Sequence, residues 1–412
     1  MWVYEKEFEM IYDCIVVGSG PAGLMAGCHL SGKKNIILEA EEKMAQKLLL
    51  SGGGQCNLTH SGDIKTFFDR YGDKSRFVRK ALSGFTNKDT MAFFNDRNTP
   101  LITREDGKVF PRSLDAWDVL RCLRQEVESL GVEIVMATKV IDIKYSECVF
   151  TIKTSKVQYQ TKSIILAAGG ASYPMTGSDG SGIKLSKELG HEIIDVKPAL
   201  TPVYIKDFAL TPLAGIAYTA GVITHWRGGK KLGSYQGDVL ITHTGLSGPG
   251  ILDNSRYMMA GDELKLRMLD ADKTLETLEA ELLKGRKKRV KTVVSDFMTK
   301  RTADLLVGLV GIENEQTCSE LGKKARKMLL SYAEGLPMTI RKMGDLKSAM
   351  TTAGGVSTKE VAAGTMASKV QAGLYFAGEI LDVDGDSGGF NIQWAFSSGR
   401  LAALSVNKYL EK

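Results

Sequence analysis

The alternation of hydrophobic and polar residues predicts an α/β domain at the start of the chain. Residues 11–18 form a short β-branched apolar run, as a buried parallel strand would, and residues 24–30 continue as a helix. A second apolar run at residues 35–38 predicts another strand, which ends at Glu39. Three later segments (132–143, 149–154 and 157–168) alternate or run apolar, which indicates a strand followed by a hairpin.

Beyond Pro198 the pattern changes. Residues 199–270 carry short runs of Thr, Val and Tyr separated by glycines, which favours small antiparallel strands. Residues 274–333 repeat apolar positions every three or four residues and are predicted to be helical. Residues 338–352 are typical of a strand followed by a segment that leads back into the first domain. With 412 residues the chain exceeds the ~250–300 at which a single core stops growing, so two or three domains are expected.

Composition indicates the cellular environment of the protein but does not define its function. The charged fraction is 25% and the net charge +6, which is compatible with anionic cofactors. Six cysteines form no CxxC pair, and no apolar run approaches the ~18 residues of a membrane span, so we expect a protein of the reducing cytoplasm with no membrane attachment. The basic run at residues 284–291 is interpreted as a solvated helix face, and nucleic acid is not expected as a partner.

The turn after the first strand is the first candidate binding element. Gly18-Ser19-Gly20-Pro21-Ala22-Gly23 fits G-x-G-x-x-G between a strand and a helix. Its glycines permit the tight turn, close approach to a pyrophosphate, and close packing of helix on strand. Glu39, 21 residues after Gly18, can accept hydrogen bonds from ribose hydroxyls. A purely structural turn is the alternative, and the motif alone leaves FAD and NAD open.

Residues 47–60 form the second candidate element. Three consecutive glycines, Gly52 to Gly54, expose backbone amides that suit close passage along a ligand, although a flexible surface loop is the alternative. Cys56 has no second cysteine nearby, since the residue five places on is Ser61. A dithiol mechanism is therefore disfavoured, and Cys56 is interpreted as a packing or flavin-proximal residue.

The third element, residues 377–394, lies about 350 residues after the first. It is predicted to be a strand ending at Gly378-Glu379, an acidic glycine-rich loop, and a helix that starts near Asn391. Together with the early turn it indicates one FAD site closed by both ends of the chain. The loop also resembles a calcium loop, but no Glu stands at the twelfth position of that pattern.

Several motifs together resemble one bacterial family of NAD(P)/FAD-dependent oxidoreductases, also called aminoacetone-oxidase-family FAD-binding enzymes. They are Lys47 with Ser51 to Thr59, Gly169 to Gly177, Thr242 to Pro249, and Gly378 to Trp394. One branch comprises bile-acid reductases of the BaiN type, which saturate ring double bonds conjugated to a 3-oxo group. The similarity covers essentially the whole chain. One departure is Gln55, where family members more often carry Arg.

The resemblance implies a Rossmann-like α/β fold of the glutathione-reductase type. The FAD-binding domain would be discontinuous (1–196 and 353–412), interrupted by a β-barrel-like domain (197–272 and 336–352) that contains a small helical subdomain (273–335). Glu379 would meet the ribityl or pyrophosphate end of FAD, and the helix start at Asn391 would face the flavin pyrimidine edge. The residues expected to bind FAD are Gly18, Ser19, Gly20, Pro21, Ala22, Gly23, Glu39, Ala40, Lys47, Gly54, Cys56, Asn57, Val140, Ala168, Gly169, Gly378, Glu379, Asp386, Gly389, Asn391 and Ile392.

The expected activity is a hydride relay in which NAD(P)H reduces the flavin and the flavin reduces a small organic substrate such as a steroid-like enone. No second G-x-G-x-x-G occurs between residues 196 and 350, so NAD(P)H would be a transient visitor. Candidates to hold charge on a substrate oxygen are Tyr173 and His243. The histidine spacing predicts no metal site. The alternatives are a flavin amine oxidase and an RNA-associated flavin-binding protein without small-molecule turnover.

Overall fold

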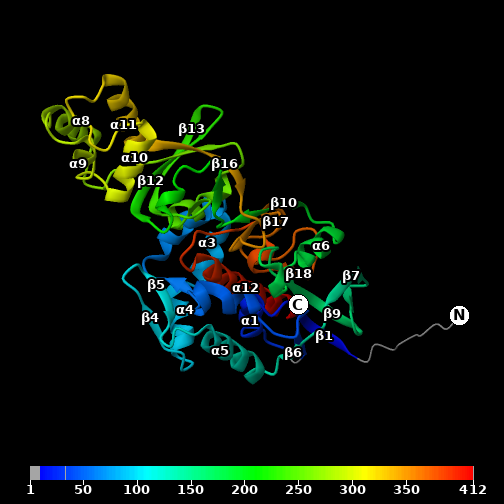
Figure 1. Ribbon diagram of the computed structural model, residues 1–412. Helices are drawn as coiled ribbons and strands as arrows, with labels where there is room; N and C mark the ends of the chain where they lie inside the picture. Colours follow the sequence, from blue (N-terminus) through cyan, green and yellow to red (C-terminus); the bar gives the residue numbers. More distant parts are fainter. Residues whose placement is uncertain (1–9, 33, 412) are drawn as a thin grey trace. The chain divides into compact units, whose positions relative to one another are not determined.

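The computed structural model describes residues 10–32 and 34–411 (Figure 1). The chain forms two compact units. Leu200–Asp345 is the inserted unit, and the chain on both sides of it forms the other, which we call the Rossmann unit. These limits differ slightly from the expected boundaries at 196/197 and 352/353. The reason is that β10 (Ile193–Ala199) pairs with β17 (Thr351–Val356) inside the Rossmann unit.

The Rossmann unit is built on a parallel sheet. Its strands β6 (Glu133–Val135), β2 (Asn35–Leu38), β1 (Ile11–Val17), β9 (Gln158–Leu166) and β18 (Leu374–Phe376) lie in that order. The buried face of β1 is apolar, as its β-branched sequence predicts. Because β18 pairs with β9 and β9 with β1, a strand from the end of the chain completes a sheet that begins at residue 11.

The first half of β9 also pairs antiparallel with β8 (Val149–Thr154) along the edge that faces away from β1, and β8 pairs with β7 (Val140–Ser146). The predicted hairpin is therefore present. The single strand expected over 132–143 is wrong: it is divided between β6 and β7. Ala137, which lies between them, has a left-handed backbone (φ 53°) that no strand continues through.

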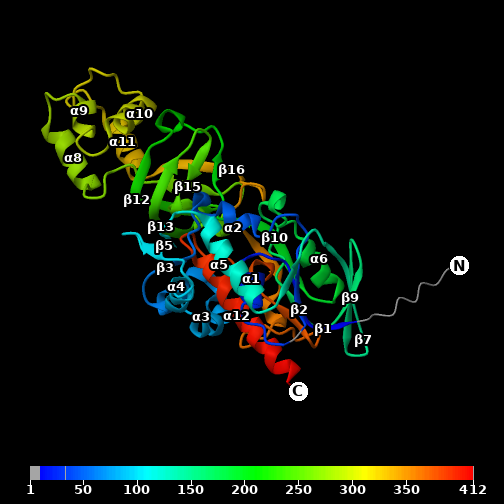
Figure 2. The same cartoon turned by 90° about the horizontal axis from the view of Figure 1, so that it is seen from below.

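Two helices far apart in sequence pack side by side against this sheet, α1 (Pro21–Gly27) and α12 (Phe390–Leu410) (Figures 1 and 2). Their approach is close because Gly399 has no side chain: a Cβ there would lie 2.2 Å from the Ala22 carbonyl oxygen. Trp394 and Phe396 are fully buried on α12. The two ends of the chain thus share one core, as the sequence predicts.

Smaller elements complete the Rossmann unit. They are α2 (Gln46–Leu50), β3 (Thr59–His60), α3 (Ser75–Gly84), α4 (Asn87–Asn95), β4 (Leu101–Thr103), β5 (Lys108–Pro111), α5 (Ala116–Ser129) and α6 (Ser181–Glu188). Strands β3, β5 and β4 form a separate antiparallel sheet in that order.

The inserted unit contains a closed antiparallel barrel. Its strands follow the order β11-β14-β13-β12-β15-β16, and β16 pairs back to β11. Their bounds are β11 (Val203–Ile205), β12 (Ala217–Arg227), β13 (Lys230–Ile241), β14 (Gly245–Ser247), β15 (Glu263–Leu266) and β16 (Leu336–Met343), with the short helix α7 (Pro249–Leu252) after β14. The predicted small antiparallel strands are therefore present, and closure leaves the barrel without free edges.

A buried charged group lies in this barrel. His225 and Asp262 are almost completely buried, with Nε2 of the histidine 2.7 Å from Oδ2 of the carboxylate. Arg227 adds bonds of 2.7 and 2.8 Å to the two carboxylate oxygens. Burial works to raise the pKa of Asp262, but the Arg227 and His225 bonds outweigh it and lower that pKa to about 2.

Between β15 and β16 the chain forms four helices, α8 (Leu275–Lys284), α9 (Val290–Val294), α10 (Lys300–Val310) and α11 (Lys323–Gly335). The predicted helical subdomain is therefore present. The interpretation of the basic run 284–291 as a helix face is wrong, because α8 ends at Lys284 and residues 285–289 connect it to α9. None of the helices in the described residues is both long and apolar enough to cross a membrane.

Candidate functional site

The glycine turn between β1 and α1 has the shape that its sequence predicts. Gly18 has a φ of 104°, and a Cβ there would lie 2.6 Å from the Ala167 carbonyl oxygen. At Gly23 a Cβ would lie 1.9 Å from the Gly18 oxygen, so the helix closes tightly on the turn. Gly20, just before Pro21, differs, because a Cβ there would meet nothing within 4 Å. The space over Gly20 is open, as an approaching ligand requires.

Glu39 lies at the end of β2 and is held against this turn. Its Oε2 accepts hydrogen bonds from the Ser19 amide (2.8 Å) and the Ser19 hydroxyl (2.5 Å), and its Oε1 accepts one from the Glu41 amide (2.9 Å). The side chain is nearly buried, and Ala40 beside it is half-buried. A carboxylate accepts about four hydrogen bonds, so capacity remains for a further donor such as a hydroxyl.

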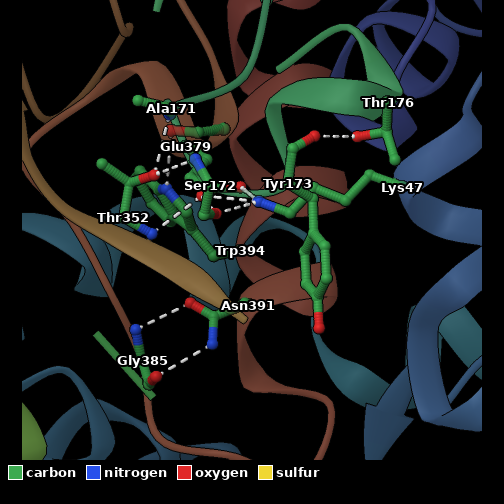
Figure 3. A network of polar contacts seen from close by, with 11 residues as sticks. Lys47, Ala171, Ser172, Tyr173, Thr176, Thr352, Glu379, Gly385, Asn391 and Trp394 are labelled. Atoms are coloured by element: carbon green, nitrogen blue, oxygen red, sulfur yellow. Dashed lines mark hydrogen bonds and ion pairs between the residues drawn. The ribbon is translucent and has the colours of Figure 1, made fainter. Parts of the chain in front are cut away.

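An ion pair joins α2 to the strand end after β18 (Figure 3). The Lys47 ammonium lies 2.7 and 2.6 Å from the two oxygens of Glu379 and 2.6 Å from the Ser172 hydroxyl. Glu379 also accepts hydrogen bonds from Ser172 (2.9 Å) and from the Thr352 amide (2.9 Å). Four segments that are distant in sequence therefore meet at one carboxylate.

This network determines the charge state of Glu379. Burial works to raise the pKa of the carboxyl group, but the Lys47 charge and the hydrogen bonds from Lys47, Thr352 and Ser172 outweigh it, so that pKa lies below its ordinary value. Oε1 of Glu379 accepts three of these hydrogen bonds, whereas Oε2 accepts only the one from Lys47. A direct contact from Glu379 to a cofactor, as the resemblance implies, would therefore be made through Oε2.

The glycine-rich segment after α2 is held in a left-handed conformation. Gly52, Gly53 and Gly54 have φ values of 57°, 69° and 87°, and Cys56 follows at 57°. Asn57 is nearly buried, and among the described residues its Oδ1 has no hydrogen-bond partner. A buried polar atom without a partner is costly, which makes Asn57 a candidate to bind a ligand.

The burial of Cys56 decides whether its thiol can take part in redox chemistry. Cys56 is fully buried, and burial raises the pKa of its thiol to about 12, opposed by a hydrogen bond with Ser51. A redox-active thiolate is therefore not available at neutral pH.

Gln55 accepts a hydrogen bond of 2.6 Å from Arg104, whose guanidinium stacks 3.9 Å above the Phe110 ring. Arg104 thus brings a positive charge to the position where the resembling family more often has Arg.

The turn after β9 supplies a further group of small residues. Gly169 has a φ of 76°, and a Cβ there would lie 2.9 Å from the Ser178 hydroxyl. Ser178 is buried and its hydroxyl has no partner among the described residues. Ala168, the residue before Gly169, is half-buried. Val140 is buried at the first position of β7.

The loop before α12 is fixed by its own side chains. The helix begins at Phe390, one residue before the predicted start, after Gly389 with a φ of 97°. The Asn391 side chain accepts a hydrogen bond from the Gly385 amide and donates one to the Gly385 oxygen, both of 2.8 Å (Figure 3). Asp386 lies 3.5 Å from Arg70. The Asn391 side chain therefore holds the loop. The first-turn backbone amides of α12 have no intrahelical acceptor, which makes them candidates to bind a ligand.

The structure places the two candidate catalytic residues in different units. Tyr173 belongs to the Rossmann unit, has a left-handed backbone (φ 54°) and donates its amide to Leu346. Figure 3 shows its ring directed away from Glu379, and its hydroxyl is not hydrogen-bonded to any described residue. His243 belongs to the inserted unit, at the exposed turn between β13 and β14. Both assignments stay predictions.

Sequence reasoning missed Ser172, Ser178, Thr352 and Arg104. Ser172 and Ser178 lie in or next to a motif that was recognised, and small polar residues around a conspicuous Lys and Glu were the available signal. Thr352 and Arg104 carry no comparable local signal. In the part of the chain that the structure describes, no group of three or more His, Cys, Asp or Glu side chains is arranged to hold a metal ion.

The parallel sheet, its glycine turn and the carboxylate after the second strand define the class: a Rossmann-type FAD-binding domain, here interrupted by an antiparallel barrel. The predicted fold class is confirmed. The family described as HI0933-like protein Rossmann domain matches residues 12–405, and this chain belongs to that family of FAD-dependent oxidoreductases.

Curated relatives align over nearly the whole chain. A 3-dehydro-bile acid delta(4,6)-reductase of Clostridium scindens is 30% identical, over 95% of this chain and 98% of its own. Proteins named ribosomal RNA dihydrouridine synthase from Haemophilus influenzae and Escherichia coli are each 28% identical, over 96% of this chain and 98% of theirs. Among solved structures, a 3-ketosteroid-delta4-(5alpha)-dehydrogenase of Rhodococcus jostii shares the fold, with a TM-score of 0.51, 13% identity and 98% coverage of both chains.

Proposed function

We propose that this protein is a flavin-dependent reductase that uses NAD(P)H to saturate a carbon–carbon double bond conjugated to a carbonyl group. One observation carries the proposal. Relatives aligned over almost the whole chain are named for two substrates, a bile acid and a ribosomal RNA uridine, that undergo the same chemical change. A delta-4 bond beside a 3-oxo group and the 5,6 bond of uracil are both conjugated to a carbonyl.

The residues of the Rossmann unit fit FAD. The open space over Gly20 suits a pyrophosphate, and Glu39 has acceptor capacity for ribose hydroxyls. Asn57 and Ser178 present buried polar atoms without partners among the described residues. The first-turn amides of α12 suit the negative charge that develops on a reduced flavin ring. The family and these four features support FAD as the cofactor.

When bound, FAD would supply the hydride that this reduction needs, after accepting it from NAD(P)H. In the balanced reaction the hydride adds to the carbon β to the carbonyl, the displaced π electrons move to the carbonyl oxygen, and a proton adds to the α carbon. NAD(P)H is oxidised to NAD(P)⁺. The described part of the inserted unit is barrel and helices rather than a second nucleotide-binding sheet, which supports a transient nicotinamide.

The protein's part in this reaction is to bind the substrate, orient it and help to protonate it. Tyr173 is the better candidate to donate a hydrogen bond to the substrate oxygen, because a phenol hydroxyl is a hydrogen-bond donor and no described residue accepts a bond from this one. Lys47 and Glu379 fix the relative positions of α2, the turn before Tyr173 and the strand end after β18. Their role in the proposal is positional.

Anaerobic absorbance measurements test the proposal. We expect the purified protein to show the flavin absorption band, NADH or NADPH to bleach it, and a 4-ene-3-oxo steroid or a uridine-containing RNA to restore it with formation of the saturated product. Tyr173→Phe should slow the restoring step and leave the bleaching step unchanged. Protein that stays colourless after incubation with FAD would overturn the proposal. Bleaching by a primary amine with peroxide formed on reoxidation would replace it with the amine-oxidase alternative.

A further inference from the structure

The helical part of the inserted unit holds most of the excess positive charge of the chain. Between residues 273 and 335 there are 13 lysines and arginines and nine acidic residues, a net charge of +4, against +6 for the whole chain. Eight of the basic side chains are exposed and form no ion pair with any described residue. Two of them, Lys300 and Arg301, lie at the start of α10, and the other six form what we call the basic cluster: Arg286, Lys287, Lys288, Lys323, Lys324 and Lys327.

Backbone hydrogen bonds bring the two halves of the basic cluster together. The Ser319 amide donates to the Arg286 oxygen, and the Cys318 amide donates to the Lys288 oxygen. A β-bridge between Arg289 and Thr317 adds to this pairing. The connection from α8 to α9 is therefore fixed beside the segment that leads into α11. The first three cations and the three at the start of α11 belong to one local structure.

The position of the second half is unfavourable for the protein alone. Lys323 and Lys324 occupy the first turn of α11, where the helix dipole is positive and acidic residues are preferred, and that turn contains no acidic residue. Neighbouring acids do neutralise other cations here: Lys291 pairs with Asp304 at 2.6 Å, and Arg326 pairs with Glu279 at 3.6 Å. The six cations of the basic cluster lack such neutralisation, so an anionic partner would relieve the repulsion between them.

We propose that the basic cluster is an RNA-docking surface. This inference rests on the function proposed above, in which a uracil base in RNA is one of the two substrates considered. RNA is favoured over an anionic membrane because relatives that align over 96% of the chain, helical part included, are named for ribosomal RNA. Evenly spread lysines and arginines match a phosphate backbone, which dominates the affinity of RNA-binding surfaces.

The test compares two independent triple variants with one control. Arg286→Ala/Lys287→Ala/Lys288→Ala and Lys323→Ala/Lys324→Ala/Lys327→Ala each remove half of the basic cluster. The control, Lys80→Ala/Lys88→Ala/Lys153→Ala, removes three exposed lysines of the Rossmann unit. Circular dichroism and flavin content establish that each protein is folded. The first readout is binding of a synthetic RNA hairpin with a uridine-containing loop, measured over a range of salt concentrations.

We expect each basic-cluster variant to weaken RNA binding by roughly tenfold or more and to reduce the slope of log affinity against log salt by about three, while the control matches the wild type. In both basic-cluster variants, dihydrouridine formation in the hairpin should have a higher KM than in the wild type and an unchanged kcat. Equal RNA binding by wild type and both variants would overturn the proposal, as would binding to phosphatidylserine vesicles in place of RNA.

The outcome for the docking surface can be separated from the outcome for the chemistry. Reduction of a small enone by NAD(P)H needs no docking surface, so it should be the same in all four proteins. If enone reduction is normal but the variants bind RNA like the wild type, only the docking surface is refuted. If RNA binding depends on the basic cluster but neither an enone nor uridine is reduced, the docking surface stands, and the proposed reductase function and the uracil substrate are refuted.

Discussion

Replacing Lys47 with methionine should destabilise the Rossmann unit by about 2–4 kcal/mol. The ammonium of Lys47 lies within 2.7 Å of both Glu379 oxygens, and the two side chains are only 23% and 21% exposed. Removing one member of a fully buried pair costs about 3–5 kcal/mol, and leaving a buried polar group unsatisfied costs about 1–3 kcal/mol. The residual exposure and the two remaining partners, Ser172 and Thr352, place the expected loss between these ranges.

The loss should depend on pH with a definite sign. In the wild type the pKa of Glu379 is lowered, so its contribution to stability is present above the ordinary carboxyl pKa and is lost as pH falls through the lowered value. Without Lys47 the effect of burial remains and raises that pKa, so the variant gains stability as Glu379 is protonated. The stability difference between the two proteins should therefore shrink from neutral to acid pH.

Thermal unfolding followed at several pH values measures this difference. For a unit of this size about 1 kcal/mol corresponds to about 2 °C, so the midpoint should fall by about 4–8 °C at neutral pH. Lys47→Met/Glu379→Gln should recover part of the loss, because it removes the uncompensated charge. Lys80→Met, at an exposed lysine, is the control. A midpoint difference that is constant with pH, or a double variant no more stable than the single one, would refute the reasoning.

Three other predictions test separate parts of the structure. Gly20→Ala should leave the thermal midpoint unchanged but weaken FAD binding at least tenfold in a titration. Gly23→Ala should weaken FAD binding and also lower the midpoint, because its Cβ would lie 1.9 Å from a carbonyl oxygen. Equal midpoints for the two variants would contradict this geometry. Cys56 should resist iodoacetamide at mildly alkaline pH in the folded protein, because the pKa of its thiol is about 12, and rapid alkylation detected by mass spectrometry would show that it is not buried. Asp262→Asn should lower the midpoint at neutral pH, and the difference should disappear as pH falls from the ordinary carboxyl range towards about 2, where the wild-type carboxylate is itself protonated.

The parts of the fold that local sequence controls were predictable. The β1–α1 turn follows from its own residues, because Gly18 and Gly23 are the ones whose side chains would collide with backbone. The start of α12 was predicted within one residue, since Gly388-Gly389 marks the change of backbone direction. The barrel strands and the helices of the inserted unit also follow local periodicity.

The parts that depend on distant contacts were not. Lys47 and Glu379 are separated by 332 residues, and only the pairing of β18 with β9 brings them together. The sequence alone therefore assigned both to the cofactor rather than to each other. The basic run shows a different failure, because a local signal was overlooked: Gly285 directly after Lys284 is a usual helix stop, and it ends α8.

The packing of α12 on α1 affects how the protein can fold during synthesis. A ribosome makes β1, α1 and β9 early, but β18 and α12 emerge only after the inserted unit is complete. Until then, the second half of one edge of β9 has no partner and the backbone at Ala22 is uncovered. The inserted unit, in contrast, is one continuous stretch of chain, so its barrel already has all its strands. The inserted unit is therefore expected to become protease-resistant on the ribosome first, whereas the Rossmann unit should become able to bind a nucleotide only after α12 has emerged.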